Sequence, residues 1–223
     1  MYLFKKRRYQ KKYAATLDLL EKNNLPNLRK KIKILIVDDE SDDIYQILKE
    51  RQYDVYYKSD MTYSIEAEPF EIVIMDIRGV AKRLHSNMEG FALACDVKKK
   101  YPLKRVCCYS GSIHKEISEQ LSEGKVDAFF VKDLDIDKMC EKIDSMILSY
   151  ADYKIQWEVL RRELVNNKID DADIEKIYKA YEEGFRCGDL MNLNETVVGV
   201  LQNGTVLLNV ISSIISLLKV SVV

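Results

Sequence analysis

Five short apolar runs alternate with amphipathic stretches between residues 32 and 150, and this alternation restricts the fold more than any other feature of the sequence. The runs are Ile32–Val37, Val55–Tyr57, Ile72–Met75, Val106–Tyr109 and Ala128–Val131. Runs of this length and composition predict strands. The stretches between them predict helices at 42–51, 62–67, 90–100, 113–121 and 136–149. We therefore expect an α/β fold with a doubly wound, five-stranded parallel sheet.

Helical segments are expected on both sides of this region, so we divide the chain at residues 1–30, 31–150 and 151–223. The first part predicts a basic helix over 2–22, which the sequence NNLPNL ends. After Tyr150 the strand pattern stops, and helical patterns continue over about 152–166 and 171–184. The third part is thus a helical module, and it ends in a hydrophobic tail.

Acidic side chains follow two of the expected strands at the point where each ends. KILIVDDE ends the first run in Asp38, Asp39 and Glu40, and IVIMDIRG ends the third run in Asp76. The carboxyl ends of parallel strands meet along one edge of the sheet, so Asp38, Asp39 and Asp76 should lie close together. Crowded carboxylates repel one another unless a cation neutralises them, and oxygen ligands of this kind suit Mg²⁺. The sequence therefore predicts a magnesium site at this edge.

A hydroxyl and a lysine follow the last two runs. Ser110, next to Gly111, ends the fourth run, and Lys132 ends the fifth. Each of these residue types is ordinary at a strand end when taken singly, because an Asp there is usually a turn or capping residue. Together, carboxylates, a hydroxyl and a lysine around a divalent cation form a site for phosphoryl transfer, in which Asp76 is the nucleophile.

The ordered set ILIVDDE, IVIMDIRG, MEGFAL, CCYSGS and DAFFVKD resembles the receiver domain of two-component response regulators, the CheY-like family. The resemblance covers about residues 31–150 and implies a flavodoxin-like fold. It also implies that Asp76 accepts a phosphoryl group from a histidine kinase or a small phosphodonor.

The same resemblance assigns roles to the other residues of the predicted site. It implies that Mg²⁺ is held by Asp38 and Asp39, together with Asp76 and the backbone carbonyl of Arg78. Lys132 then pairs with the phosphoryl group. In the same way, Ser110 and Phe129 are implied to be the switch residues that respond to phosphorylation.

Three departures from the family pattern concern the surroundings of the site. Asp133 stands where the family usually has proline, the loop between Asp76 and Gly90 is longer, and the helix expected near 62–67 is short. These differences bear on partner docking and on the lifetime of the phosphoryl group. Two interpretations of Arg78 stay open: its side chain stabilises or replaces a phosphoryl group, or it is a solvated loop residue.

The first 31 residues are strongly basic. They hold ten Lys and Arg residues against two acids, a net charge of +8, which leaves −9 for the rest of the chain. Tyr9, Tyr13, Leu17 and Leu20 recur at helical spacing in this arm. Three interpretations stay open: packing of this stripe on the body, contact with an anionic membrane, or binding to nucleic acid or a protein partner.

The final segment, 196–223, is almost free of charge. An apolar stripe at helical spacing is formed by Leu207, Ile211, Ile214 and Leu218. Burial of this stripe within the chain, or in a homodimer or higher oligomer, is the first interpretation, and membrane insertion is the second. No basic recognition helix follows residue 150, so DNA is not an expected partner.

These features predict a cytoplasmic, Mg²⁺-dependent receiver protein and not an independent enzyme. Phosphorylation of Asp76 would control self-association or partner binding through the helical flanks. One alternative is a pseudo-receiver, an interaction scaffold that keeps the fold and never turns over phosphate. Another is a membrane-acting effector whose hydrophobic tail is regulated by the receiver. Five cysteines without paired spacing, and no secretory signal before the basic run, fit a reducing compartment.

Overall fold

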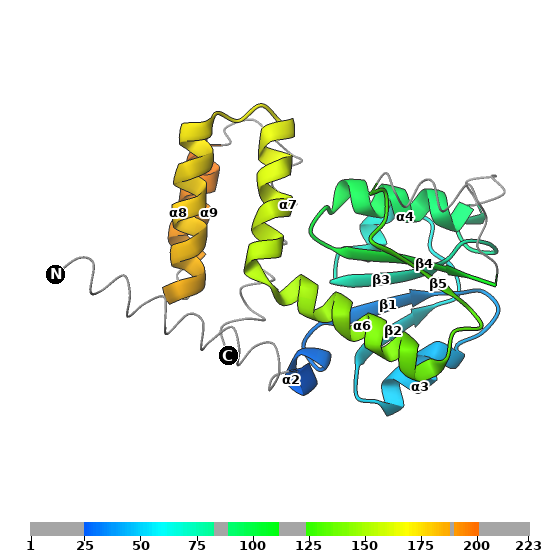
Figure 1. Ribbon diagram of the computed structural model, residues 1–223. Helices are drawn as coiled ribbons and strands as arrows, with labels where there is room; N and C mark the ends of the chain where they lie inside the picture. The colour runs from blue at the N-terminus through cyan, green and yellow to red at the C-terminus, as the bar shows by residue number, and fades with distance from the viewer. Residues whose placement is uncertain (1–24, 83–88, 112–123, 188–189, 201–223) are drawn as a thin grey trace.

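The computed structural model describes residues 25–82, 89–111, 124–187 and 190–200 of the chain, and Figure 1 shows an α/β body beside a helical unit. The body contains a five-stranded sheet in the order β2-β1-β3-β4-β5, with every pair parallel. Its strands are β1 (Lys33–Val37), β2 (Asp54–Lys58), β3 (Ile72–Asp76), β4 (Arg105–Ser110) and β5 (Ala128–Val131). This order is that of the flavodoxin-like, doubly wound folds, so the structure confirms the predicted fold class.

The centre and the edges of the sheet differ in burial. Every residue of β3 and β4 is buried, whereas the edge strands β2 and β5 are mostly half-buried. A parallel sheet that is covered on both faces needs apolar side chains in both directions, which explains the uninterrupted run IVIM. Successive residues alternate between two cores: Val73 and Met75 belong to one, and Ile72 and Ile74 belong to the other.

Helices cover both faces of the sheet, as Figure 1 shows. One core packs against η1 (Ser64–Ala67) and α4 (Glu89–Lys100). The other packs against α2 (Leu25–Arg29), α3 (Asp43–Glu50) and α6 (Ile136–Ala151). Because all strands are parallel, the segments that follow them lie along one edge, where the acids and the lysine were expected to meet.

The helix α2 lies in the sequence NNLPNL, which we expected only to end an N-terminal helix. Proline is favoured in the first turn of a helix, where the backbone N–H has no partner within the helix, and Pro26 occupies this turn. Leu28 is buried in the core of the α/β body. Arg29 donates to the Asp144 carboxylate of α6 from Nε at 2.9 Å and from Nη2 at 2.5 Å. The end of the basic arm is therefore attached to the body.

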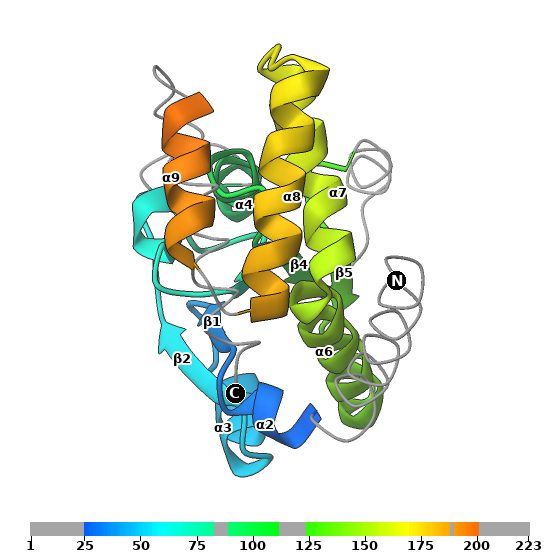
Figure 2. The ribbon, with the colours of Figure 1, turned by 90° about the vertical axis from the view of Figure 1, so that its left-hand side faces the viewer.

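A helical unit follows the α/β body and consists of α7 (Tyr153–Asn166), α8 (Asp171–Cys187) and α9 (Leu190–Val200). Figure 2 shows the three helices side by side. Their shared core includes aromatic rings that contact one another in tilted arrangements, from Trp157, Tyr178, Tyr181 and Phe185. The helices predicted at 152–166 and 171–184 are confirmed within two or three residues at their ends, which is usual for helix boundaries.

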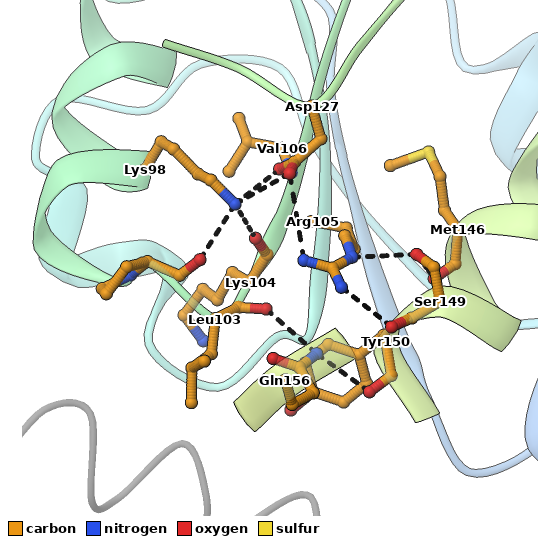
Figure 3. Close-up of polar contacts among 11 residues, drawn as sticks. Lys98, Leu103, Lys104, Arg105, Val106, Asp127, Met146, Ser149, Tyr150 and Gln156 are labelled. Atoms are coloured by element: carbon orange, nitrogen blue, oxygen red, sulfur yellow. Dashed lines mark hydrogen bonds and ion pairs between the residues drawn. The ribbon is translucent and has the colours of Figure 1, made fainter. Parts of the chain in front are cut away.

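The body and the helical unit meet where α6 ends and α7 begins. Asp152 caps α7 by accepting from the backbone N–H groups of Lys154 at 2.8 Å and Ile155 at 3.3 Å. Gln156 is fully buried, and its side-chain amide donates to the carbonyls of Tyr150 at 2.9 Å and Leu103 at 3.4 Å, as Figure 3 shows. Leu103 itself belongs to the core of the helical unit. The joint is thus built from both apolar and polar contacts.

Several predictions fall outside the described residues. These are the helix over 2–22, the helix over 113–121 and the stripe formed by Leu207, Ile211, Ile214 and Leu218. Among the residues that the structure does describe, no helix combines the length and the apolar character that crossing a membrane requires. Cys95, Cys107, Cys108 and Cys140 are free thiols.

Candidate functional site: an acid cluster at the carboxyl edge of the sheet

Three carboxylates converge at the carboxyl ends of β1 and β3. One oxygen from each of Asp38, Glu40 and Asp76 lies within 4.8 Å of the others. Asp38 and Asp76 are almost fully buried, with 1% and 3% of their surface exposed, whereas Glu40 is exposed. The parallel pairing of β1 with β3 brings the two aspartates together, because Val37 pairs with Met75 immediately before them. The predicted convergence of Asp38 and Asp76 is therefore present in the structure.

Lys132 follows β5 and reaches across the edge to all three carboxylates. Its Nζ lies 2.6 Å from Asp76 Oδ2, 2.9 Å from Glu40 Oε2 and 3.6 Å from Asp38 Oδ2. Its backbone N–H donates to the carbonyl of Ser110 at 2.9 Å, which holds the start of this loop against β4. Burial opposes the charged form of this ammonium, but its hydrogen bonds to Asp76 and Glu40 outweigh that effect and raise the pKa of Lys132.

Asp38 has the least favourable environment of the cluster. Burial raises the pKa of Asp38, and the nearby Asp76 carboxylate raises it further. The backbone N–H of Glu40 donates to Asp38 Oδ1 at 2.9 Å and acts in the opposite direction, as does the charge of Lys132. Two buried carboxylates and one bridging lysine leave negative charge in excess, which is the condition that favours a bound cation.

Asp39 points to a different partner. Its Oδ2 forms an ion pair with Lys82 Nζ at 3.0 Å, and its carboxylate lies against Gly79, where an added Cβ would lie 2.0 Å from Oδ1. The backbone of Gly79 has a φ of +77°, a conformation that glycine adopts without strain. Within the described residues the third carboxylate of the cluster is thus Glu40, which was not among the ligands predicted from the sequence.

The backbone around Asp76 is tightly packed. The Arg78 N–H lies 3.3 Å from Asp76 Oδ1, and the Arg78 residue is exposed. On the other side, α4 begins so close to β3 that a Cβ on Gly90 would lie 1.9 Å from the Asp76 carbonyl oxygen. The Gly90 N–H donates to the carbonyl of Ile77 at 3.1 Å. Only glycine allows this approach, which explains Gly90 in the first turn of α4.

Ser110 and Phe129 lie on the two strands beyond β3. Ser110 is buried at the carboxyl end of β4, one residue after Tyr109, which pairs with Asp76. Phe129 on β5 pairs with Cys108 on β4, and its side chain is half-buried against the core beneath α4. Ser110 therefore lies at the predicted edge of the sheet, and the switch roles of Ser110 and Phe129 stay predictions.

The donor set of this site fits a hard divalent cation. All the converging ligand atoms are carboxylate oxygens, and two of the three carboxylates are buried, so water solvates their charge poorly. Magnesium is bound in proteins through one or two carboxylates together with water. The cluster can therefore hold such an ion next to a carboxylate, Asp76, that is placed to act as a nucleophile.

No protein-family model and no curated protein match the chain. Among solved structures it is similar to a CheY-like response regulator receiver domain protein from Methanospirillum hungatei JF-1, at 23% identity and a TM-score of 0.45 over 53% of this chain and 95% of that one. The receiver domain of NtrX from Brucella abortus has 24% identity and a TM-score of 0.42 over 51% and 97%. Chemotaxis protein CheY4 from Vibrio cholerae has 17% identity and a TM-score of 0.41 over 52% and 98%. These three structural neighbours of the chain are thus receiver domains, and the similarity to them is a similarity of fold.

Proposed function

We propose that this chain is a response-regulator-type signalling protein in which Asp76 accepts a phosphoryl group. The donor would be a histidine kinase or a small phosphodonor. The modified state would then change self-association or partner binding through the helices on either side of the α/β body. The observation that carries this proposal is the joint contact of Lys132 with Asp38, Glu40 and Asp76 at one edge of the sheet.

Each residue of the cluster has a distinct role in this proposal. Asp76 supplies the attacking carboxylate oxygen, and Lys132 exchanges part of its contact with the carboxylates for contact with the phosphoryl oxygens. Asp38, Asp39, Asp76 and the Arg78 carbonyl are the ligands that the family resemblance implies for Mg²⁺, and Glu40 is a further candidate. When bound, the cation offsets the negative charge of the carboxylates and of the incoming phosphoryl group.

The switch part of the proposal concerns the neighbouring strands. Ser110 lies one residue beyond the partner of Asp76 on β4, so its hydroxyl is a candidate donor to a phosphoryl oxygen. Phe129 packs on the same side of the sheet as α4, and movement of its ring would alter the surface between β5 and α4. A shift at this surface is how a local charge change can reach a partner.

A pseudo-receiver scaffold is the second candidate function. It is favoured by the ion pairs of Lys132 with Asp76 and of Lys82 with Asp39, because these contacts offset part of the negative charge without any metal. The two functions differ in one property: only the receiver transfers phosphate.

The deciding experiment is incubation of the full-length protein with Mg²⁺ and acetyl phosphate, followed by intact-mass measurement. We expect the wild-type protein to gain the mass of one phosphoryl group and the Asp76→Asn variant to gain none. The control variant Asp133→Asn, which changes an exposed residue next to Lys132, should gain the same mass as the wild type. An unchanged mass of the wild-type protein with acetyl phosphate, phosphoramidate and carbamoyl phosphate would leave the scaffold function in its place.

A further inference from the structure

A second polar site lies at the opposite edge of the sheet from Asp76. Figure 3 shows part of it: Arg105 at the first position of β4, with Asp127 and Ser149 on either side. The cavity has a volume of about 410 Å³ and lies between α6, α7 and the start of β5. Among its lining residues are Arg105, Asp127, Lys142, Ile155, Val159 and Arg162. Because β4 is six residues long, this site lies roughly 17 Å from the carboxyl edge.

Positive charge is in excess on the walls of this cavity. Arg105, Lys142 and Arg162 line it, and Asp127 is the one acidic residue among its lining residues. The Asp127 carboxylate is already engaged: it forms an ion pair with Lys98 at 2.8 Å and accepts from the Val106 N–H at 2.8 Å. Its oxygen lies 3.9 Å from Arg105 Nη1, which is beyond hydrogen-bond distance. Asp127 therefore pairs closely with Lys98 and more loosely with Arg105, and within the described residues it forms no ion pair with Lys142 or Arg162.

The two exposed cations of the cavity have no carboxylate partner within the described part of the chain. Arg162 donates from Nε to the backbone carbonyl of Glu158 at 3.2 Å. Lys142 Nζ lies over the Phe130 ring, 5.7 Å from its centroid. Arg105 is buried and donates to Ser149 Oγ at 2.9 Å and to the Ser149 carbonyl at 2.8 Å. Burial lowers the pKa of Arg105, the charge of Asp127 opposes this effect, and the weaker influence of Arg162 lowers the pKa further.

Apart from Ser145 and Ser149, the remaining lining is apolar and belongs to two helices and a strand. Ile155 and Val159 come from α7, Met146 from α6, and Ala128 and Phe130 from β5. Ile155 is one of the large apolar side chains that stay exposed, at 42% of its surface. A cavity of this volume with an apolar wall and a few convergent polar groups has the size and lining of a small-molecule site.

We propose that this cavity binds a phosphorylated small molecule of nucleotide size. The phosphate groups contact Arg105, Lys142 and Arg162, and the apolar part of the ligand covers Ile155 and Val159. Guanidinium groups match phosphate oxygens in geometry and hold them through paired, charge-assisted hydrogen bonds. The bound molecule contacts α6 and α7 together and so stabilises the joint between the α/β body and the helical unit. This site is separate from the acid cluster and does not depend on the function proposed for it.

The test is calorimetric titration of the full-length protein with ATP as the probe, in buffer that contains EDTA so that no metal bridges the nucleotide to the acid cluster. We expect saturable binding of one ATP per chain. Arg162→Gln should weaken it by about tenfold or more, because a charge-assisted hydrogen bond is lost. Arg161→Gln, an exposed arginine of the same helix that does not line the cavity, should change it by less than about twofold.

A second pair of variants repeats the comparison on α6. Lys142→Gln should weaken ATP binding, whereas Lys138→Gln, exposed on the same helix and outside the cavity, should not. Titrations with inorganic phosphate and with adenosine should each show weaker binding than ATP, since each supplies half of the contacts. The proposal is overturned if millimolar ATP gives no saturable binding. Equal losses in Arg161→Gln and Arg162→Gln, or phosphate that binds as tightly as ATP, would overturn it too.

Discussion

Asp38 is the residue at which stability and the proposed function conflict most clearly. It is almost fully buried beside Asp76, and burial raises the pKa of its carboxyl above the ordinary Asp value of 3.8. A carboxyl whose folded pKa is raised binds its proton more tightly in the folded state than in the unfolded state. The free energy of unfolding therefore falls as the pH rises through the interval above 3.8. Local costs of this kind are expected at functional sites.

Replacement of this carboxylate should separate the two effects. In metal-free buffer at pH 7, Asp38→Asn should raise the free energy of unfolding by on the order of 1 kcal/mol, because a buried charge is removed while the oxygen that accepts from Glu40 is kept. The gain should shrink below pH 4, where the wild-type carboxyl is protonated. Urea unfolding at pH 7 and pH 3.5 measures both, with exposed Asp133→Asn as the control. A loss of stability at pH 7 would contradict this account.

The position of a site residue was predictable from the sequence where that residue directly follows a strand. Asp38, Asp76, Ser110 and Lys132 lie at the edge where the apolar runs placed them. The choice between Asp39 and Glu40 was not predictable, because it depends on which way the loop after β1 turns. That loop directs Asp39 toward Lys82, and no periodic pattern encodes such a direction.

At the scale of elements, the contact between β3 and α4 determines the geometry of the site. Gly90 lies in the first turn of α4 and packs against the Asp76 carbonyl, so the helix begins directly beside the carboxyl end of β3. Strand and helix ranges were predictable here because buried strands are continuous apolar runs and α4 has helical periodicity. The short helix α2 was missed, because five residues around Pro26 give too little periodicity to recognise.

A methyl group at position 90 should disturb this contact. Gly90→Ala would place a Cβ 1.9 Å from the Asp76 carbonyl oxygen, so α4 and β3 must move apart. We expect a loss of about 1–3 kcal/mol in the free energy of unfolding and weaker Mg²⁺ binding. Gly199→Ala in α9, where an added Cβ meets no atom within 4 Å, is the control and should be neutral or stabilise by up to about 1 kcal/mol. Equal urea midpoints for Gly90→Ala and wild type would refute the contact.

At the scale of the whole molecule, α6 links the two edges of the sheet. It begins four residues after Lys132 and ends beside the cavity that Arg105 and Ser149 line. The helical unit then continues from the same end of α6 and is held by Gln156 and Leu103. The sequence predicted α7 and α8, but it predicted neither α9 as a separate helix nor the joint between this unit and the body. That joint depends on the buried side chain of Gln156 and on contacts between segments far apart in the chain.

The central claim of this account is that the carboxylates at the ends of β1 and β3 hold Mg²⁺ in partial exchange for Lys132. Calorimetric titration of the full-length protein with MgCl₂ tests it most directly. We expect one Mg²⁺ per chain, with binding at least about tenfold weaker in Asp76→Asn and unchanged in Asp133→Asn, since only the first removes a charged ligand. Binding should also weaken as the pH falls toward 4, where protons compete for Asp38. A wild-type protein that shows no saturable Mg²⁺ binding, or an Asp76→Asn variant that binds as tightly, would contradict the claim.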